Sequence, residues 1–183
     1  MFIQTEDTPN PAVLKFLPGR IVMPEGTADF RTADTTARSP LAKSLFAVAG
    51  VDGVFLGSDF VSVTKAADAE WFSVKPAVLA AVMDHFTSGL PVIEGAAPEA
   101  ATGEPDSEIV VQIKEILDTR VRPAVAQDGG DITFHEFEDG VVYLHMQGSC
   151  SGCPSSTATL KAGIENMLRY YIPEVREVRA VAA

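Results

Sequence analysis

Two cysteines are the residues of this chain with the clearest capacity for chemistry. The sequence of 183 residues contains 2 cysteines, Cys150 and Cys153, separated by Ser151 and Gly152. Two thiolates at this spacing can bind one soft metal centre together, and the small residues around them, Gly148 included, let the loop wrap. A secreted scaffold held by disulfides carries more cysteines at wider spacing. The pattern therefore predicts a metal or redox site.

The residues after the cysteines predict a helix whose positive end lies close to both sulfur atoms. Pro154 suits the first position of a helix, and the sequence from Ser155 to Tyr171 keeps a helical spacing of apolar residues. Its expected buried stripe comprises Leu160, Ile164, Met167, Leu168 and Tyr171. Because the positive end of a helix favours thiolate, we expect this loop to hold anionic sulfur.

The number of ligands is the main constraint on this site. An iron–sulfur cluster usually takes four thiolates, whereas the chain has 2 cysteines. Two copies related by a two-fold axis supply four, so we expect one cluster bridging a homodimer. A cluster held at a subunit edge can be surrendered when the dimer opens. The sequence therefore indicates a carrier that passes a cluster to other proteins, not an enzyme.

Three alternative roles for the cysteine pair remain open. Zinc needs further ligands, for which the chain offers His85, His135 and His145, none at the short spacing of a zinc finger. A dithiol oxidoreductase is a second alternative, although its helix usually starts at the first cysteine of the motif. An inert structural pair or disulfide is the third.

The elements that must position the cysteines belong to the second of two modules. Residues 91–107 are rich in Pro, Gly, Ala and Glu and predict a flexible linker between modules at 1–90 and 108–183. The second module is expected to be αββαβ. A helix begins at Glu108, capped by Ser107 or Asp106, and a turn at 128–130 ends it.

A hairpin and a last strand complete this second module. Strands at Ile132–Phe137 and Val141–Met146 are expected to pair around Asp139, with His135 and His145 on the outer face. The final strand is Val175–Val181. For the segment Asp128 to Asp131, we expect a turn without chemistry.

The first module is predicted to be ββαββα. The expected elements are strands Met1–Gln4 and Ala12–Leu17, helix Pro40–Val48 with Ser39 as its cap, strands Val51–Leu56 and Val61–Lys65, and helix Lys75–Phe86. Trp71 and Phe72 are interpreted as core or hydrophobic-staple residues. The fold class is thus α+β, with two small α/β-sandwich-like domains.

Composition and charge exclude several classes of function. The formal net charge is −11, and no segment has more basic than acidic residues, which argues against nucleic acid as a partner. No apolar stretch approaches the roughly 20 residues that span a bilayer, so no membrane partner is expected. Because Glu6 and Asp7 precede any Lys or Arg, the start does not look like an organellar leader. We therefore expect a bacterial cytoplasmic protein, or a mature form in the mitochondrial matrix.

Particular residues of both modules resemble the NifU/Nfu family. In the second module the matching positions are Pro123, Asp128, Gly129, Gly130, Asp131, Gly148, Cys150, Gly152, Cys153, Pro154, Ser155, Ser156, Thr159, Leu160, Lys161, Gly163, Ile164 and Glu165. In the first module they are Thr8, Pro9, Asn10, Pro11, Leu14, Lys15 and Phe16. Together the two similarities span nearly the whole chain outside the linker.

The resemblance implies a scaffold or carrier for a [4Fe-4S] cluster. It implies that Cys150 and Cys153 are the ligands, that an upstream assembly scaffold is the donor and that apo iron–sulfur proteins are the recipients. Four thiolates would suit [2Fe-2S] as well. The first module has no cysteine, so recognition of a donor or target is its expected role.

Overall fold

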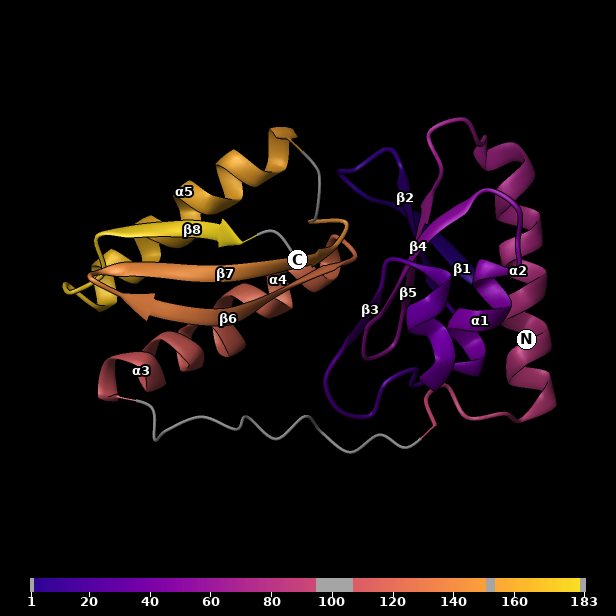
Figure 1. The fold of residues 1–183 in the computed structure, drawn as a ribbon, viewed down its shortest axis with the longest axis horizontal. Coiled ribbons are helices and arrows are strands. Elements are labelled where there is room, and N and C mark those ends of the chain that lie inside the picture. The colour runs from indigo at the N-terminus through magenta and orange to yellow at the C-terminus, as the bar shows by residue number, and fades with distance from the viewer. Residues whose placement is uncertain (1, 95–106, 151–153, 182–183) are drawn as a thin grey trace. The chain divides into compact units, whose positions relative to one another are not determined.

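The computed structural model describes residues 2–94, 107–150 and 154–181, with the side chains of residues 154–157 left out. The chain divides into two compact units, Met1–Glu99 and Ala100–Ala183, each built from helices and a sheet. The predicted α+β class is confirmed (Figure 1). Most of the predicted linker lies outside the described residues.

The first unit contains an antiparallel sheet with the strand order β1-β2-β5-β4-β3. Its strands are β1 (Gln4–Asp7), β2 (Val13–Leu17), β3 (Ala28–Phe30), β4 (Val51–Leu56) and β5 (Val61–Lys65). The predictions for β4 and β5 match to the residue. The first predicted strand was wrong, because pairing with β2 begins only at Gln4, which lies opposite Leu17.

Helices α1 (Pro40–Phe46) and α2 (Trp71–Ser88) pack on this sheet, and a short 3₁₀ helix, η1 (Ala33–Arg38), precedes α1. Ser39 caps α1 as predicted, since its hydroxyl accepts a hydrogen bond of 3.0 Å from Ala42 N–H. The same hydroxyl donates to the Val92 carbonyl at 2.6 Å. The chain after α2 therefore returns to the first unit.

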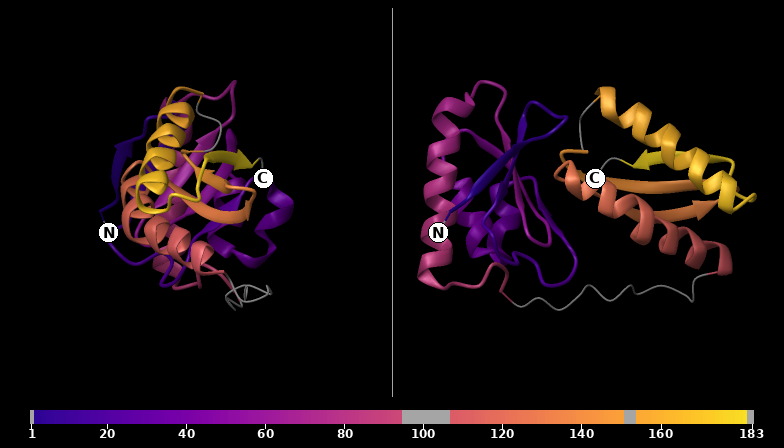
Figure 2. Two further views of the ribbon diagram at one scale, coloured as in Figure 1. Left: turned by 90° about the vertical axis from the view of Figure 1, so that its left-hand side faces the viewer. Right: turned by 180° about the vertical axis from the view of Figure 1, so that it is seen from behind.

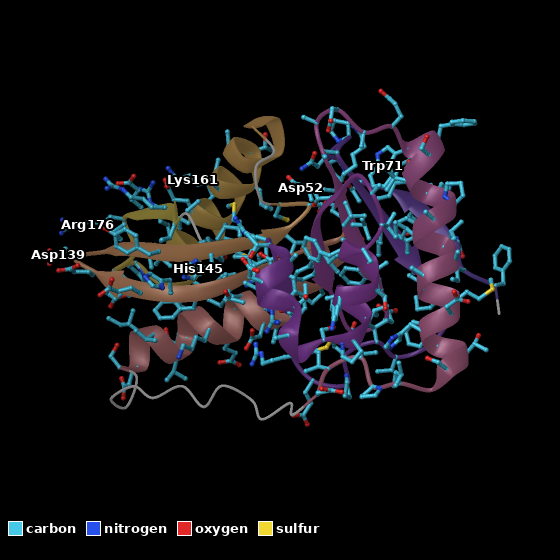
Figure 3. All side chains as sticks on the ribbon, turned by 45° about the vertical axis from the view of Figure 1, so that its right-hand side comes forward. Asp52, Trp71, Asp139, His145, Lys161 and Arg176 are labelled. Carbon is cyan, nitrogen blue, oxygen red and sulfur yellow. The ribbon has the colours of Figure 1, made fainter. Side chains whose placement is uncertain are left out.

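Sequence reasoning failed in part at the start of α2. Trp71 packs against the core and donates its indole N–H to the Pro11 carbonyl at 3.0 Å (Figure 3 labels this side chain). Phe72 is 91% exposed, so its assignment to the core was wrong. The helix begins at Trp71, earlier than predicted, and this places the two aromatic rings on different sides of it.

In the second unit, one helical segment contains a turn of wider helix. It comprises α3 (Glu108–Ile116), a π-helical turn η2 (Leu117–Val121) and α4 (Arg122–Gln127). Ser107 caps α3 as expected, accepting from Val110 N–H. Pro123 has no N–H to donate, and its ring would crowd the Thr119 carbonyl in a regular α-helix. The wider turn accommodates this proline.

The sheet of the second unit has the order β6-β7-β8. Strands β6 (Gly130–Glu138) and β7 (Val141–Gly148) form the predicted hairpin, and β8 (Glu177–Val181) pairs parallel to β7 after helix α5 (Pro154–Tyr171). The expected register holds from Ile132 to Phe134. A bulge at His135 then shifts it, so that the turn is the two-residue Asp139-Gly140 with positive φ at both positions.

The helices of this unit cover one face of its sheet (Figure 2). Their apolar residues pack on the inward-facing residues of the strands, here Ile132, Val142, Leu144 and Met146. The predicted stripe of α5 is correct at Ile164 and Leu168, and Leu160 and Met167 are partly buried. Tyr171 is 46% exposed, so its place in the stripe was wrong; Ile172, four residues after Leu168, is buried instead. Within the described residues, no helix has the length and apolarity needed to cross a membrane.

Replacement of Ser39 by alanine is expected to destabilise the first unit by about 2 kcal/mol, because α1 loses its cap and the Val92 carbonyl loses its donor. Urea unfolding followed by the fluorescence of Trp71, the single tryptophan, measures this loss. Ser44→Ala is the matched control: that hydroxyl is exposed and donates only to Pro40 of its own helix. Equal midpoints for the two variants would contradict the role of the cap.

Candidate metal-binding site at the cysteine loop

Cys150 lies two residues beyond the end of β7 and belongs to the apolar core of the second unit. Only 6% of it is exposed. Ser151, Gly152 and Cys153, the remaining residues of the predicted motif, lie outside the described residues. Helix α5 begins at Pro154, as predicted, directly after the second cysteine in the sequence. The site is therefore a loop between a central strand and the positive end of an 18-residue helix.

Gly130, the first residue of β6, lies directly against the sulfur of Cys150. A β-carbon placed on this glycine would be 2.5 Å from Cys150 Sγ and 2.9 Å from the Gln147 carbonyl oxygen. Both distances are shorter than real contacts of a β-carbon, and one of the two atoms is backbone that cannot swing aside. Cys150 can therefore adopt its observed conformation only because residue 130 is glycine.

Hydrogen bonds hold the start of the cysteine loop on the turn before β6. The Ser149 hydroxyl donates to the Asp128 carbonyl, and Ser149 N–H donates to the Gly129 carbonyl at 3.3 Å. Ser149 is 3% exposed. Gly129 and Gly148 have φ of 79° and 63°, values that favour glycine. The predicted backbone freedom of Gly148 is thus confirmed, and the expected turn is present at Asp128 and Gly129.

An ion pair between the buried Asp131 and the half-buried Arg122 fixes the other side of this turn. Both carboxylate oxygens of Asp131 accept from Arg122, at 2.9 Å from Nε and 3.0 Å from Nη2, and one also accepts from Ile132 N–H at 2.8 Å. Arg122 reaches Asp118 as well, at 3.0 Å. The hydrogen bond to Asp131 raises the pKa of the Arg122 guanidinium, which therefore stays charged. The start of α4 is in this way fastened to the start of β6.

The segment Asp128 to Asp131 was predicted to be a turn without chemistry, and the structure gives it a larger part. Gly130 and Asp131 belong to the strand, one in contact with the sulfur and the other anchoring the helix. Sequence reasoning missed Gly130, Asp131, Arg122 and Ser149 as members of the site. The one available signal was the Gly-Gly pair, since a turn with a single positive φ needs only one glycine.

The three histidines form no metal-ligand cluster among the described residues. His135 and His145 lie on the outer face of the sheet, as predicted. Nδ1 of His135 is 2.9 Å from Nε2 of His145. His85 is buried in the first unit, and burial lowers its pKa. Over residues 2–94, 107–150 and 154–181, no three His, Cys, Asp or Glu side chains gather as metal ligands do. His135 and His145 thus lie on the face of the sheet opposite the core to which Cys150 belongs.

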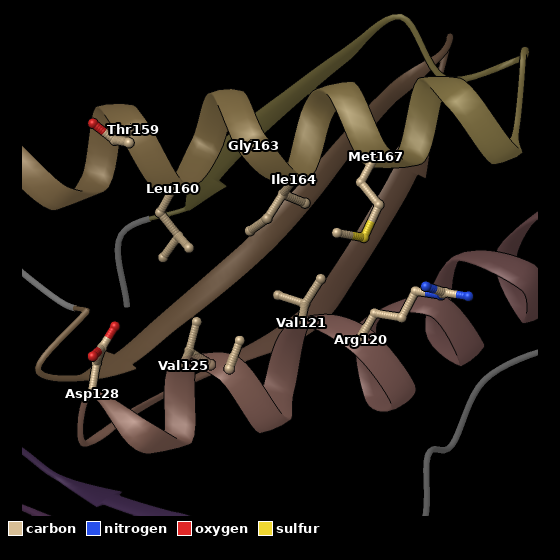
Figure 4. Close-up of a pocket in the computed structure, with 10 residues that line it drawn as sticks. Arg120, Val121, Val125, Asp128, Thr159, Leu160, Gly163, Ile164 and Met167 are labelled. Atoms are coloured by element: carbon tan, nitrogen blue, oxygen red, sulfur yellow. The ribbon is translucent and has the colours of Figure 1, made fainter.

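A groove of about 520 Å³ runs along the helical face of the unit and ends beside the loop. Figure 4 shows it between η2 and α4 on one side and α5 on the other. Its apolar floor and walls come from Val121, Ala124, Val125, Leu160, Ile164 and Met167, with Gly163 among them. Asp128 and Thr159 lie at the end toward the cysteine loop, and Arg120 lies at the far end.

Comparison with known families matches both units. Residues 3–89 match the family described as "Scaffold protein Nfu/NifU N terminal", and residues 113–179 match the NifU-like domain. Together these matches account for most of the chain.

Curated relatives are similar over nearly the whole chain. The NFU1 iron–sulfur cluster scaffold homolog, mitochondrial, of Drosophila erecta is 59% identical over 99% of this chain and 65% of its own length. The protein of the same name from Drosophila persimilis is 56% identical over the same shares. The chain thus spans about two thirds of the length of these relatives.

Among solved structures, a NifU-like protein from Saccharomyces cerevisiae shares 25% identity with a TM-score of 0.47, over 52% of this chain and 86% of that one. A protein from Staphylococcus aureus shares 28% with a TM-score of 0.41, over 45% of this chain and 99% of that one. The assignment rests on the family matches and the curated relatives, not on these structures. By that evidence, the chain belongs to the Nfu/NifU family of iron–sulfur cluster scaffold proteins.

Proposed function

We propose that this chain binds one iron–sulfur cluster through Cys150 and Cys153, shares it with a second copy, and transfers it to apo-proteins. The single observation that carries the proposal is the coordination count: a cluster takes four thiolates and the chain has 2 cysteines. A two-fold axis through the cluster doubles the supply. The family assignment supports iron–sulfur chemistry at this loop. Family resemblance favours [4Fe-4S] over [2Fe-2S] as the cargo.

The described part of the loop fits this cargo. Gly130 leaves room for the Cys150 sulfur, and the bonds from Ser149 hold the strand end in place. The helix that starts at Pro154 stabilises thiolate in the adjacent loop. When thiolates of a recipient replace Cys150 and Cys153, the same helix end stabilises the departing thiolates. Release is therefore ligand exchange, and no residue of the chain has to act as a catalyst.

Partners and compartment follow from the same role. We propose an upstream assembly scaffold as donor and apo iron–sulfur proteins as recipients. The first module, at 1–90, contains no cysteine and is proposed to recognise one of them, while 108–183 holds the cluster. The relatives are named mitochondrial, which supports the mitochondrial matrix over a bacterial cytoplasm.

The two rival functions make different predictions. A dithiol oxidoreductase would work without iron, through a reversible Cys150–Cys153 disulfide. The start of α5 at Pro154, after the second cysteine, disfavours this chemistry. A zinc-stabilised interaction module would be colourless and would contain metal without sulfide.

Replacement of Cys150 by serine is expected to abolish cluster binding, because two copies then retain only two thiolates. After anaerobic reconstitution, wild type should contain iron and acid-labile sulfide in equal amounts and run as a dimer, whereas Cys150→Ser should be monomeric and colourless. The paired variant His135→Gln with His145→Gln should keep its cluster. A brown wild-type monomer in the absence of added thiol would contradict the shared site.

Replacement of Gly130 by alanine is expected to weaken cluster retention roughly tenfold or more, since the new methyl group displaces the Cys150 sulfur. Titration of the reconstituted protein with an iron chelator measures the retention. Gly163→Ala serves as the control, because a β-carbon there meets nothing within 4 Å. If Gly130→Ala retained its cluster as firmly as this control, the packing of Gly130 on Cys150 would not matter to the site.

A further inference from the structure

The groove between α4 and α5 is apolar and ends beside the cysteine loop. It extends from Arg120 to Asp128 on one side and from Thr159 to Met167 on the other. Eight residues of helix rise about 12 Å, so the groove is long enough for about two turns of another helix. Apolar grooves of this kind between two helices are a common seat for the apolar face of a third.

Gly163 lines this groove, and no contact among the described residues requires a glycine there. It is in the interior of α5, where glycine is a poor helix former. Its φ is not in the left-handed region, and a β-carbon there would meet nothing within 4 Å. Gly130 and Gly163 thus differ: the first has the Cys150 sulfur against it, and the second faces open space. A bare backbone at the wall of an apolar groove lets an outside helix approach closely.

Opposite charges lie at the two ends of the groove. Within the described residues, neither Arg120 nor Asp128 has an ion-pair partner for its side chain; Arg120 instead lies 5.2 Å from the Tyr171 ring. A helix carries partial positive charge at its N-terminus and negative charge at its C-terminus. An occupant helix is therefore favoured with its N-terminus at Asp128, beside the cysteine loop, and its C-terminus at Arg120.

We propose that this groove binds an amphipathic helix of the recipient apo-protein, with its N-terminal end next to the cluster. The inference rests on the proposed transfer function and names the surface that makes transfer selective. The helix presents apolar side chains at i, i+3 or i+4, and i+7, and a carboxylate near its C-terminus for Arg120. Its orientation brings the segment just before the helix, with the acceptor thiolates, close to Cys150 and Cys153.

A second copy of the chain fits this groove poorly. Gly163 is ten positions after Cys153, or roughly 15 Å along a helix. If the α5 helices of two copies packed antiparallel at Gly163, their cysteine loops would lie roughly 30 Å apart. One cluster could not then join them. The groove therefore remains available when two copies share a cluster at their loops.

Transfer kinetics test this proposal on the full chain. Wild type, Gly163→Leu and the matched control Ala162→Leu are loaded anaerobically, and each is mixed with the apo form of a [4Fe-4S] protein, aconitase, or with the small chelator bathophenanthroline disulfonate. Ala162 is exposed on the same helix and does not line the groove. For Gly163→Leu, transfer to apo-aconitase should slow about tenfold or more, because the leucine fills the groove. Iron release to the chelator should match wild type.

A second pair of variants tests the orientation of the occupant. Arg120→Glu should slow transfer to apo-aconitase, and Arg120→Lys should restore most of the rate because it keeps the charge. Equal rates to apo-aconitase for Gly163→Leu and wild type, at equal cluster content, would overturn the groove and leave the proposed function intact. A loaded Gly163→Leu that had lost its dimer would assign the groove to a second copy and overturn the proposal. If wild type bound no cluster, the proposed function itself would fail, and the role of the groove with it.

Discussion

Gly130 lies at the start of β6, directly against the sulfur of Cys150. The position of Cys150 depends on this residue having no side chain. The first cysteine cannot occupy its position unless β6 begins with a bare backbone. The position of Gly130 is set in turn by Asp131, whose carboxylate is held by Arg122 at the start of α4. The hydroxyl of Ser149, the residue after β7, donates to the Asp128 carbonyl in the turn before β6. Contacts from α4, from the turn before β6 and from the end of β7 therefore fix the segment that packs against the Cys150 sulfur.

The π-helical turn in the first helical segment of the second unit lies directly before the arginine that holds Asp131. Pro123 cannot continue a regular α-helix, and the wider turn before it changes the direction in which the next side chains point. Arg122, the residue directly before the proline, is the one that reaches Asp131. The irregular helix and the half-buried ion pair thus act together to position the start of β6. Through Asp131, both are connected to Gly130, the residue that lies against the Cys150 sulfur.

Much of this fold could be predicted from local pattern. The bounds of β4 and β5, the cap at Ser39, the hairpin and the start of α5 follow from spacing, capping chemistry and proline geometry. The cysteine pair and its place between strand and helix were equally visible. The failures have tertiary causes. Phe72 is an apolar residue on the outer side of a helix, Tyr171 is one position from the buried line, and β3 is too short to carry a periodic signal. The part played by Gly130 could not be predicted, because it depends on a contact between residues twenty positions apart.

The parallel pairing of β8 with β7 has a consequence for how the protein is made. The β6–β7 hairpin needs only neighbouring residues and can form as soon as they leave the ribosome. Strand β8 cannot pair until the whole of α5 has been synthesised, because the helix is the crossover between the two strands. The cysteine loop is part of that crossover. The second unit can therefore complete its sheet only after the cysteine loop, α5 and β8 have all been synthesised.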